Sequence, residues 1–211
     1  MSRPDITPVL LATSQVKQGA ALLARIFQHD PLIQFLLVDS ASRLNKAAHF
    51  YQAAIRLGLL YGEVYTTPTL DGMAVWISPG HTDLTFEQLR KSGFLTTMLT
   101  IGLKPLSRFI RTASYIEKVK KQTLSTRPHW NLTLFGIDPS QQGQGLGGCL
   151  IEPILTRADT EYLPCYLESA NERNLTFYRR HGFQVMGHGH VPKRGPQIWF
   201  MLREPGHKSI S

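Results

Sequence analysis

Hydrophobic residues recur along the chain with two periods, which divide it into helices and strands. Spacings of three and four predict helices over residues 15–28 and 43–58, and a long helical region over residues 85–122 that is interrupted at Pro105. Shorter β-rich runs predict strands at residues 8–12, 63–67, 72–78, 130–137, 165–169, 183–190 and 197–203. Strands and helices alternate in the second half, so the pattern predicts an α/β protein.

The strand predicted at residues 130–137 changes phase part-way along. Its first apolar residues share one face: Trp130, Leu132 and Leu134. Phe135 and Ile137 fall on the opposite face. A phase change beside Gly136 predicts a β-bulge or a local distortion of the strand. A distorted strand exposes main-chain N–H and C=O groups that a neighbouring strand would otherwise bind.

Length and composition indicate one globular domain. The chain has 211 residues, of which 42% are hydrophobic, enough for a substantial core. It has neither a long uninterrupted apolar run nor a signal-peptide pattern, and its two cysteines, Cys149 and Cys165, suit reduced core thiols. We therefore expect a cytoplasmic protein without membrane contact. No Cys or His spacing indicates a metal site.

A glycine-rich turn follows the strand at residues 130–137. It reads Asp-Pro-Ser-Gln-Gln-Gly-Gln-Gly-Leu-Gly-Gly over residues 138–148, and a helical stripe of apolar residues begins near Gly145. Glycines let the backbone approach a ligand closely, and the free N–H groups of a new helix favour an anion. The turn therefore predicts a phosphate-binding site.

Two familiar phosphate motifs fit this turn poorly. A P-loop needs Lys and Ser or Thr after its last glycine, and neither follows Gly148. The dinucleotide pattern is literally present as Gly143, Gly145 and Gly148, with the acid Glu168 further on. Five residues separate the strand from the first glycine, however, and too few follow Gly148 to complete a doubly wound sheet.

A third pattern, Gln142-x-x-Gly145-x-Gly147, resembles the acyl-CoA-binding motif of the GNAT superfamily of N-acetyltransferases. A second segment agrees with it, because residues 166–183 read YLESANERNLTFYRRHGF. A strand, an Asn, a Tyr and Gly-Phe in this order resemble the second CoA-side motif of the superfamily. The details are similar to the branch that includes puromycin acetyltransferase: Leu-Glu-Ser, Arg-Asn-Leu-x-Phe-Tyr and Pro153 in the first CoA helix.

The resemblance implies the GNAT fold. This is an α/β (α+β) fold with a mixed, mostly antiparallel central sheet of about seven strands, a splayed central strand pair and helices on both faces. We expect a single acyl-CoA N-acyltransferase domain over residues 1–211. Within it, residues 1–128 form the acceptor side, residues 129–203 form the CoA-binding core and residues 204–211 are a loose tail.

The resemblance also implies acetyl-CoA as the acyl donor, without a metal. Its binding residues are then Phe135, Gly136, Ile137, Gln142, Gly143, Gln144, Gly145, Leu146, Gly147, Gly148, Asn174 and Tyr178. Asn171 is a weaker match than Asn174 for the residue that binds the CoA arm. Tyr178 matches the general acid of the family. The base stays open between Glu168, His129 and water.

The acceptor is the least defined part of the sequence. Several aromatic residues could line an apolar amine pocket or belong to the core: Tyr51, Tyr61, Tyr65, Trp76, Phe86 and Phe94. Clustered acids that would attract a polyamine are absent, so we expect a small hydrophobic or aromatic primary amine. Two alternatives remain open, namely a non-catalytic acyl-CoA sensor or interaction domain and an acetyltransferase of protein or peptide amines.

The net charge of +8 is concentrated between residues 104 and 127. This basic segment is either the solvated face of a helix or a rim that attracts CoA phosphates. The chain shows no nucleic-acid-binding module, so we expect no nucleic-acid partner. We expect a monomer or a homodimer.

Overall fold

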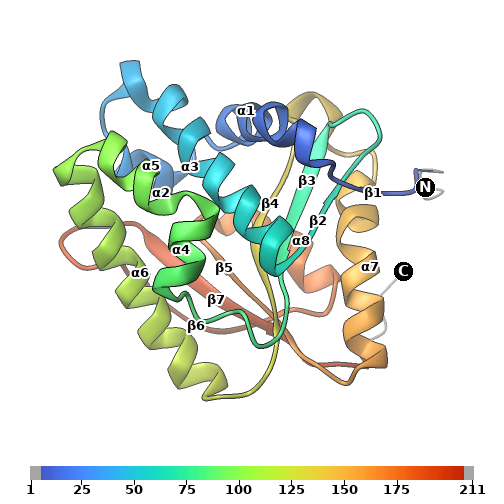
Figure 1. Ribbon diagram of the computed structural model, residues 1–211. Helices are drawn as coiled ribbons and strands as arrows, with labels where there is room; N and C mark the ends of the chain where they lie inside the picture. Colours follow the sequence, from blue (N-terminus) through green and yellow to red (C-terminus); the bar gives the residue numbers. More distant parts are fainter. Residues whose placement is uncertain (1–5, 207–211) are drawn as a thin grey trace.

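A seven-stranded sheet with the order β1-β2-β3-β4-β5-β7-β6 runs through the protein (Figure 1). The computed structural model describes residues 6–206. Its strands are β1 Val9–Leu10, β2 Gly62–Thr66, β3 Gly72–Ile77, β4 Trp130–Ile137, β5 Cys165–Ser169, β6 Gln184–His190 and β7 Gln197–Arg203. Neighbouring strands are antiparallel except β4 and β5, which are parallel. This confirms the predicted mixed, mostly antiparallel sheet.

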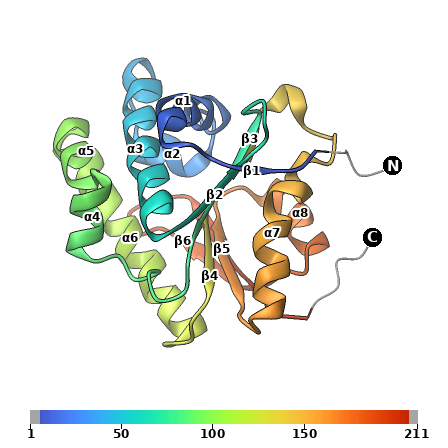
Figure 2. The same cartoon turned by 45° about the vertical axis from the view of Figure 1, so that its right-hand side comes forward.

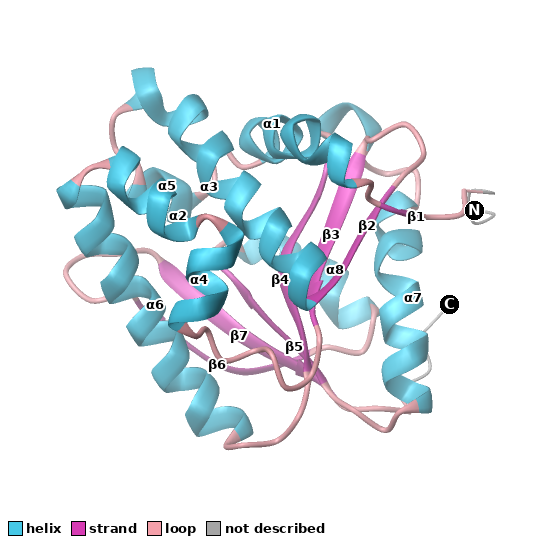
Figure 3. Cartoon of the chain, viewed as in Figure 1, coloured by secondary structure: helices cyan, strands magenta, loops and turns pink. Residues whose placement is uncertain are grey.

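Helices cover both faces of the sheet (Figure 2 and Figure 3). The helices are α1 Val16–Ile26, α2 Pro31–Leu36, α3 Ser40–Tyr61, α4 Phe86–Ser92, α5 Phe94–Ile101, α6 Leu103–Leu124, α7 Leu146–Thr160 and α8 Leu175–Arg180. One core lies between the sheet and α7 and α8, and it includes Trp76, Leu150 and Phe183. The opposite face packs against α1, α3 and α6. The two faces therefore carry separate cores.

The helical region predicted at residues 85–122 is broken at glycines and not at the proline. Gly93 and Gly102 have positive φ angles of 86° and 95°, so each ends a helix in a backbone conformation that other residues rarely adopt. Pro105 lies in the first turn of α6, where an N–H group has no intrahelical acceptor, so proline costs the helix no hydrogen bond there. The interruption predicted at Pro105 is therefore wrong.

Helix α2 was not predicted, because six residues are too few for a periodic pattern. Local chemistry defines it instead. The Asp30 carboxylate accepts hydrogen bonds from the N–H groups of Leu32 at 2.9 Å and Ile33 at 3.3 Å, and Pro31 occupies the first helical position. This arrangement fixes the Asp30 carboxylate at the start of α2.

The predicted distortion of β4 is present, but it lies at Thr133 and not beside Gly136. Val75 pairs with Leu134 and Trp76 pairs with Leu132, which leaves Thr133 as the extra residue of a bulge. Leu134 consequently faces the opposite side of the sheet from Leu132, so the expectation that they share a face is wrong. The bulge returns Phe135 to the face that carries α7 and α8.

Strands β4 and β5 separate after a short paired stretch. Their parallel pairing ends at Leu132 and Leu167, although β4 continues to Ile137 and β5 to Ser169. Beyond this point β4 is paired with β3 alone. The splayed central pair that was predicted is therefore present, and it leaves main-chain groups of residues 133–137 without a strand partner on one side.

Candidate active site

The glycine-rich turn joins the splayed end of β4 to the start of α7. Gly143 and Gly145 have positive φ angles of 79° and 80°, a conformation that residues with a Cβ rarely adopt. Helix α7 begins at Leu146 with Gly145 as its N-cap, so the N–H groups of its first turn have no intrahelical acceptor. They are available to an anion, and the helix dipole favours one.

Side chains before the glycines hold this turn in place. Gln142 donates from Nε2 to the Ile137 carbonyl oxygen at 3.1 Å. The Asp138 carboxylate accepts from the Ser140 N–H at 3.0 Å, and the Asp138 N–H donates to the Asp71 carbonyl oxygen at 2.7 Å. Gln142 therefore acts in this structure by fixing the backbone of the turn.

A groove of about 1240 Å³ runs from this turn past β4 to α8. It is lined by the whole turn from Gln141 to Cys149 and by residues 135–137 of β4. Gly147 and Gly148 bring α7 close to α8: a Cβ would lie 3.0 Å from the Phe177 ring at Gly147 and 3.2 Å from His181 at Gly148. All of the sequence-predicted donor residues except Tyr178 line this groove.

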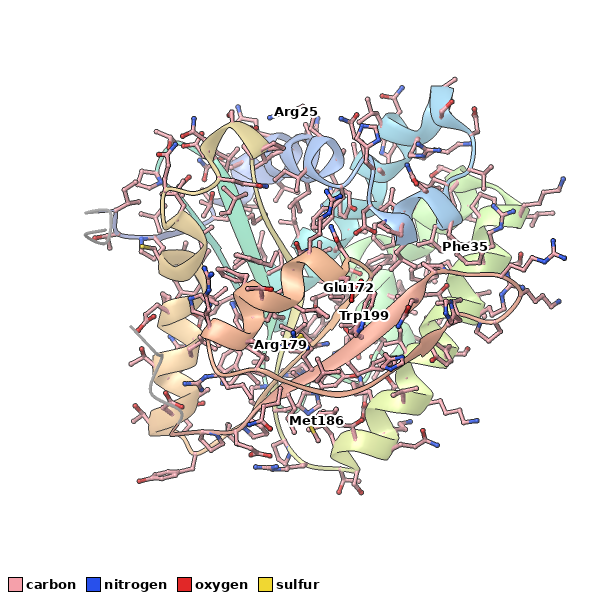
Figure 4. All side chains as sticks on the ribbon, turned by 180° about the vertical axis from the view of Figure 1, so that it is seen from behind. Arg25, Phe35, Glu172, Arg179, Met186 and Trp199 are labelled. Carbon is pink, nitrogen blue, oxygen red and sulfur yellow. The ribbon has the colours of Figure 1, made fainter. Side chains whose placement is uncertain are left out.

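Two arginines of this groove belong to the motif at residues 166–183, but the sequence alone did not assign them a role. Arg173 and Arg180 line the groove and are exposed. Along the chain Arg173 follows Glu172 and Arg180 follows Arg179, and Figure 4 labels Glu172 and Arg179. No described residue of α6 lines the groove, so the basic segment at residues 104–127 is not its rim. The position of Arg173, directly before Asn174 in the motif, was the available signal.

A second cavity, of about 270 Å³, lies on the acceptor side and reaches through the gap between β4 and β5. Aromatic rings dominate its wall: Phe27, Phe50, Tyr51, Phe94, Phe109 and Phe135. Phe50 packs edge-on against Tyr51, Phe94 and Phe109 at centroid distances of 5.4–5.6 Å. The cavity is therefore suited to an apolar body rather than to a strongly hydrated one.

Of the six aromatic residues considered for an amine pocket in the sequence, Tyr51 and Phe94 line this cavity. Trp76 and Tyr65 pack in the core beneath α7, and Tyr61 packs against His81. Phe86 is 71% exposed. Sequence periodicity could not separate these environments, because aromatic residues occur in both cores.

One end of the acceptor cavity is polar. Glu168 lines it with Glu117 and Lys120 of α6. Lys120 is buried, lies 2.7 Å from a Glu117 carboxylate oxygen and donates to the Thr82 carbonyl oxygen at 2.7 Å. Lys120 therefore does not fit a solvated helix face, which was one of the two interpretations of the basic segment. Burial raises the pKa of Glu168 to about 7, although the charge of Lys120 lowers it.

Tyr178 lies on α8 at the sheet gap and lines the acceptor cavity. Its ring packs against Phe135, Phe177 and Phe183 at centroid distances of 6.2, 5.5 and 5.9 Å. Burial, with a smaller effect of the nearby Asp30 carboxylate, raises the pKa of its hydroxyl. Tyr178 is therefore a protonated hydroxyl near neutral pH.

The two Asn candidates differ in how their side chains are used. Asn171 accepts a hydrogen bond from the Arg173 N–H at 3.1 Å, so it caps the short 3₁₀ turn Glu172–Asn174. Asn174 precedes α8 without making a side-chain cap and lines both the groove and the acceptor cavity. The geometry thus favours Asn174 as a ligand-facing residue.

His129 lies away from both cavities. It is buried, its Nδ1 lies 2.9 Å from the Arg127 carbonyl oxygen, and its ring packs against Tyr166. Burial lowers its pKa, which keeps the imidazole neutral. Its position places it outside the group of residues that could contact a substrate in either cavity.

Comparison with known proteins agrees with this geometry. Residues 110–185 match the family described as the acetyltransferase (GNAT) domain. The chain is 25% identical over 200 residues to an uncharacterised N-acetyltransferase of Schizosaccharomyces pombe, covering 92% of this chain and 81% of that protein.

Solved structures share the fold. A structure described as histone acetyltransferase HPA2 and related acetyltransferase from Corynebacterium glutamicum superposes with a TM-score of 0.64 at 18% identity, covering 97% of this chain and 99% of that one. The polyamine N-acetyltransferase of Drosophila melanogaster gives a TM-score of 0.61 at 13% identity, with 95% and 100% covered. Residues 110–185 therefore match a GNAT acetyltransferase domain, and this match, the N-acetyltransferase relative and the shared fold support an acyltransferase enzyme.

Neither a membrane-spanning helix nor a metal-binding cluster is found among the described residues. Over residues 6–206, no helix is long and apolar enough to cross a membrane. Within the same part of the chain, no three His, Cys, Asp or Glu side chains are grouped so that they could hold a metal ion.

Proposed function

We propose that the protein transfers an acetyl group from acetyl-CoA to a primary amine of a small molecule, by direct attack in a ternary complex. One observation supports this proposal: a groove that begins at the glycine-rich turn shares lining residues with an apolar cavity at the gap between β4 and β5. A long donor and a small acceptor can occupy these two spaces at once, and their reacting atoms then meet at the gap.

The donor would be held mainly by main chain. Its pyrophosphate would accept hydrogen bonds from N–H groups of the turn and of the first residues of α7. Residues 135–137, which have no strand partner on the side of the gap, would pair with the pantetheine arm. A main-chain N–H there would polarise the thioester carbonyl and stabilise the oxyanion that forms on attack.

Glu168 and Tyr178 would move the protons. The amine nitrogen attacks the thioester carbon and loses a proton to Glu168, directly or through water. The C–S bond then breaks, and Tyr178 gives its proton to the leaving thiolate. In water a thiol is a stronger acid than a phenol, but burial raises the basicity of a thiolate as well, so transfer coupled to C–S cleavage is feasible.

The acceptor cavity supports a small amine with an apolar or aromatic body. A cavity of about 270 Å³ is larger than the roughly 150 Å³ that holds benzene and far smaller than a protein segment needs. This favours a small molecule over a protein or peptide amine. We also propose the puromycin acetyltransferase-like branch for this chain, which Pro153 inside α7 supports.

Calorimetric titration with acetyl-CoA and with NADPH tests the donor assignment. We expect acetyl-CoA to bind with micromolar-range affinity, because the groove is built around one turn and an open strand edge. We expect no response to NADPH. Tight NADPH binding without a response to acetyl-CoA would overturn the proposal.

Arg180→Ala should raise the Kd of acetyl-CoA by about tenfold, because a charge-assisted contact to phosphate is worth roughly 1.5 kcal/mol or more. The difference in Kd between the variant and the wild type should become smaller as salt is added, because Arg180 is exposed and its charge is screened. Arg179→Ala is the matched control, because Arg179 is exposed on the same helix and lines neither cavity. Equal effects of the two variants would argue against a specific phosphate contact at Arg180.

Glu168→Gln should remove the acidic limb of the pH–rate profile. With a pKa of about 7, Glu168 is an ionised base above that pH, so wild-type kcat should fall as the pH falls through 7. The fold should tolerate this change. The pKa of Glu168 is raised from its ordinary value of 4.5 to about 7, so the folded protein loses stability as the pH rises through this range, and the neutral Gln avoids that loss. An unchanged acidic limb in a folded Glu168→Gln variant would assign the proton to water or another group.

A further inference from the structure

Four residues line both the donor groove and the acceptor cavity: Phe27, Asp30, Phe135 and Asn174. They define the place where the two cavities meet. If acetyl-CoA occupies the groove and an amine the cavity, as proposed above, the thioester and the nitrogen must meet here. A side chain that lines both spaces is therefore in a position to contact the reacting groups.

Asp30 is the charged member of these four. Its Oδ1 atom caps α2 by accepting from Leu32 and Ile33, which fixes the carboxylate at this junction. Asp30 lines the acceptor cavity together with Tyr51 and Tyr178. Its charge adds to the effect of burial in raising the pKa of each tyrosine hydroxyl.

The surroundings of Asp30 supply no counter-charge. Between residues 6 and 206, no Lys, Arg or His side chain lies within ion-pair distance of its carboxylate. Burial raises the pKa of Asp30, whereas the two main-chain hydrogen bonds lower it. A desolvated carboxylate without a cationic partner is costly to keep unless a ligand provides one.

We infer that Asp30 is the residue that binds the ammonium group of the acceptor, holding its nitrogen at the junction of the two cavities. The remainder of the acceptor lies among the aromatic rings. In this arrangement Asp30 selects a cationic amine over a neutral molecule of the same shape. The ammonium first loses one proton to bulk water, which frees the nitrogen lone pair. Glu168 then takes the second proton as the nitrogen attacks the thioester carbon, as proposed above.

Asp30→Asn removes the negative charge of the side chain and keeps its size. Asn is as good an N-cap as Asp and keeps the acceptor oxygen that holds α2, so the fold should survive. Asp39→Asn is the matched control, because Asp39 caps α3 through the Ala41 N–H, is exposed and lines neither cavity. Thermal unfolding of all three proteins reports any change in stability.

The probes are 2-phenylethylamine and its neutral counterpart 2-phenylethanol, titrated into each protein saturated with CoA. The wild type should bind the amine more tightly than the alcohol. Asp30→Asn should weaken binding of the amine on the order of 10- to 100-fold and leave binding of the alcohol within about twofold. Asp39→Asn should behave as wild type.

Three results would overturn the inference: no preference of the wild type for the amine over the alcohol, an unchanged amine affinity in Asp30→Asn, or equal weakening of amine and alcohol. The first needs no variant, so it stands even if Asp30→Asn fails to fold. A wild type that does not bind acetyl-CoA marks instead the failure of the proposed function.

Discussion

Tyr178→Phe is expected to lower kcat by about 100- to 10,000-fold, the usual contribution of a general acid. The Kd of acetyl-CoA should barely change, because Tyr178 lines the acceptor cavity and not the donor groove. Phe retains the ring contacts with Phe135, Phe177 and Phe183, so the midpoint of thermal unfolding should stay close to wild type. Steady-state kinetics across pH measure the effect.

Tyr162→Phe is the control for that experiment, since Tyr162 is 83% exposed and lines neither cavity. It should leave kcat unchanged. If Tyr178→Phe also keeps the wild-type kcat and the wild-type dependence of kcat on pH at alkaline pH, Tyr178 is a packing residue. The proton for the thiolate would then come from solvent.

Gly145→Val is expected to abolish measurable binding of acetyl-CoA. The φ angle of 80° at Gly145 strains any residue with a Cβ, and a branched side chain there would also stand where phosphate oxygens approach the start of α7. Calorimetry measures the loss, and circular dichroism confirms that the variant is folded.

Gly80→Val is the control that distinguishes the effect of backbone strain from the loss of a phosphate-binding site. Gly80 has a φ angle of 83°, a Cβ added there would meet nothing within 4 Å, and the residue has no part in either cavity. The variant should lose stability but bind acetyl-CoA as wild type does. A folded Gly145→Val variant with wild-type affinity would show that the turn is not the phosphate site.

The donor side of the site was predictable because local sequence fixes it. The glycines at positive φ, the strand before them and the order of Asn174 and Tyr178 all lie within short segments of the chain. The splay was predictable in kind, since the phase change in β4 was visible. Its location at Thr133 was not, because the register of a bulge depends on which residues of β3 pair with it.

The acceptor side was less predictable because it is assembled from distant segments. Asp30 caps a six-residue helix with no periodic signal, yet it lines both cavities, as Asn174 does. Lys120 reads as part of a charged helix face, and only the packing of α6 against the sheet shows that it is buried. Such contacts are set by tertiary structure, which a residue pattern does not record.

Release of free CoA thiol with primary amines tests the central claim most directly. Purified protein is mixed with acetyl-CoA and a panel of small aromatic and aliphatic amines, and thiol and acetylated amine are quantified together. We expect thiol release that depends on the amine, an equal amount of N-acetylated product, and initial rates that indicate a ternary complex. Thiol release that no amine accelerates, or none at all, would contradict the account.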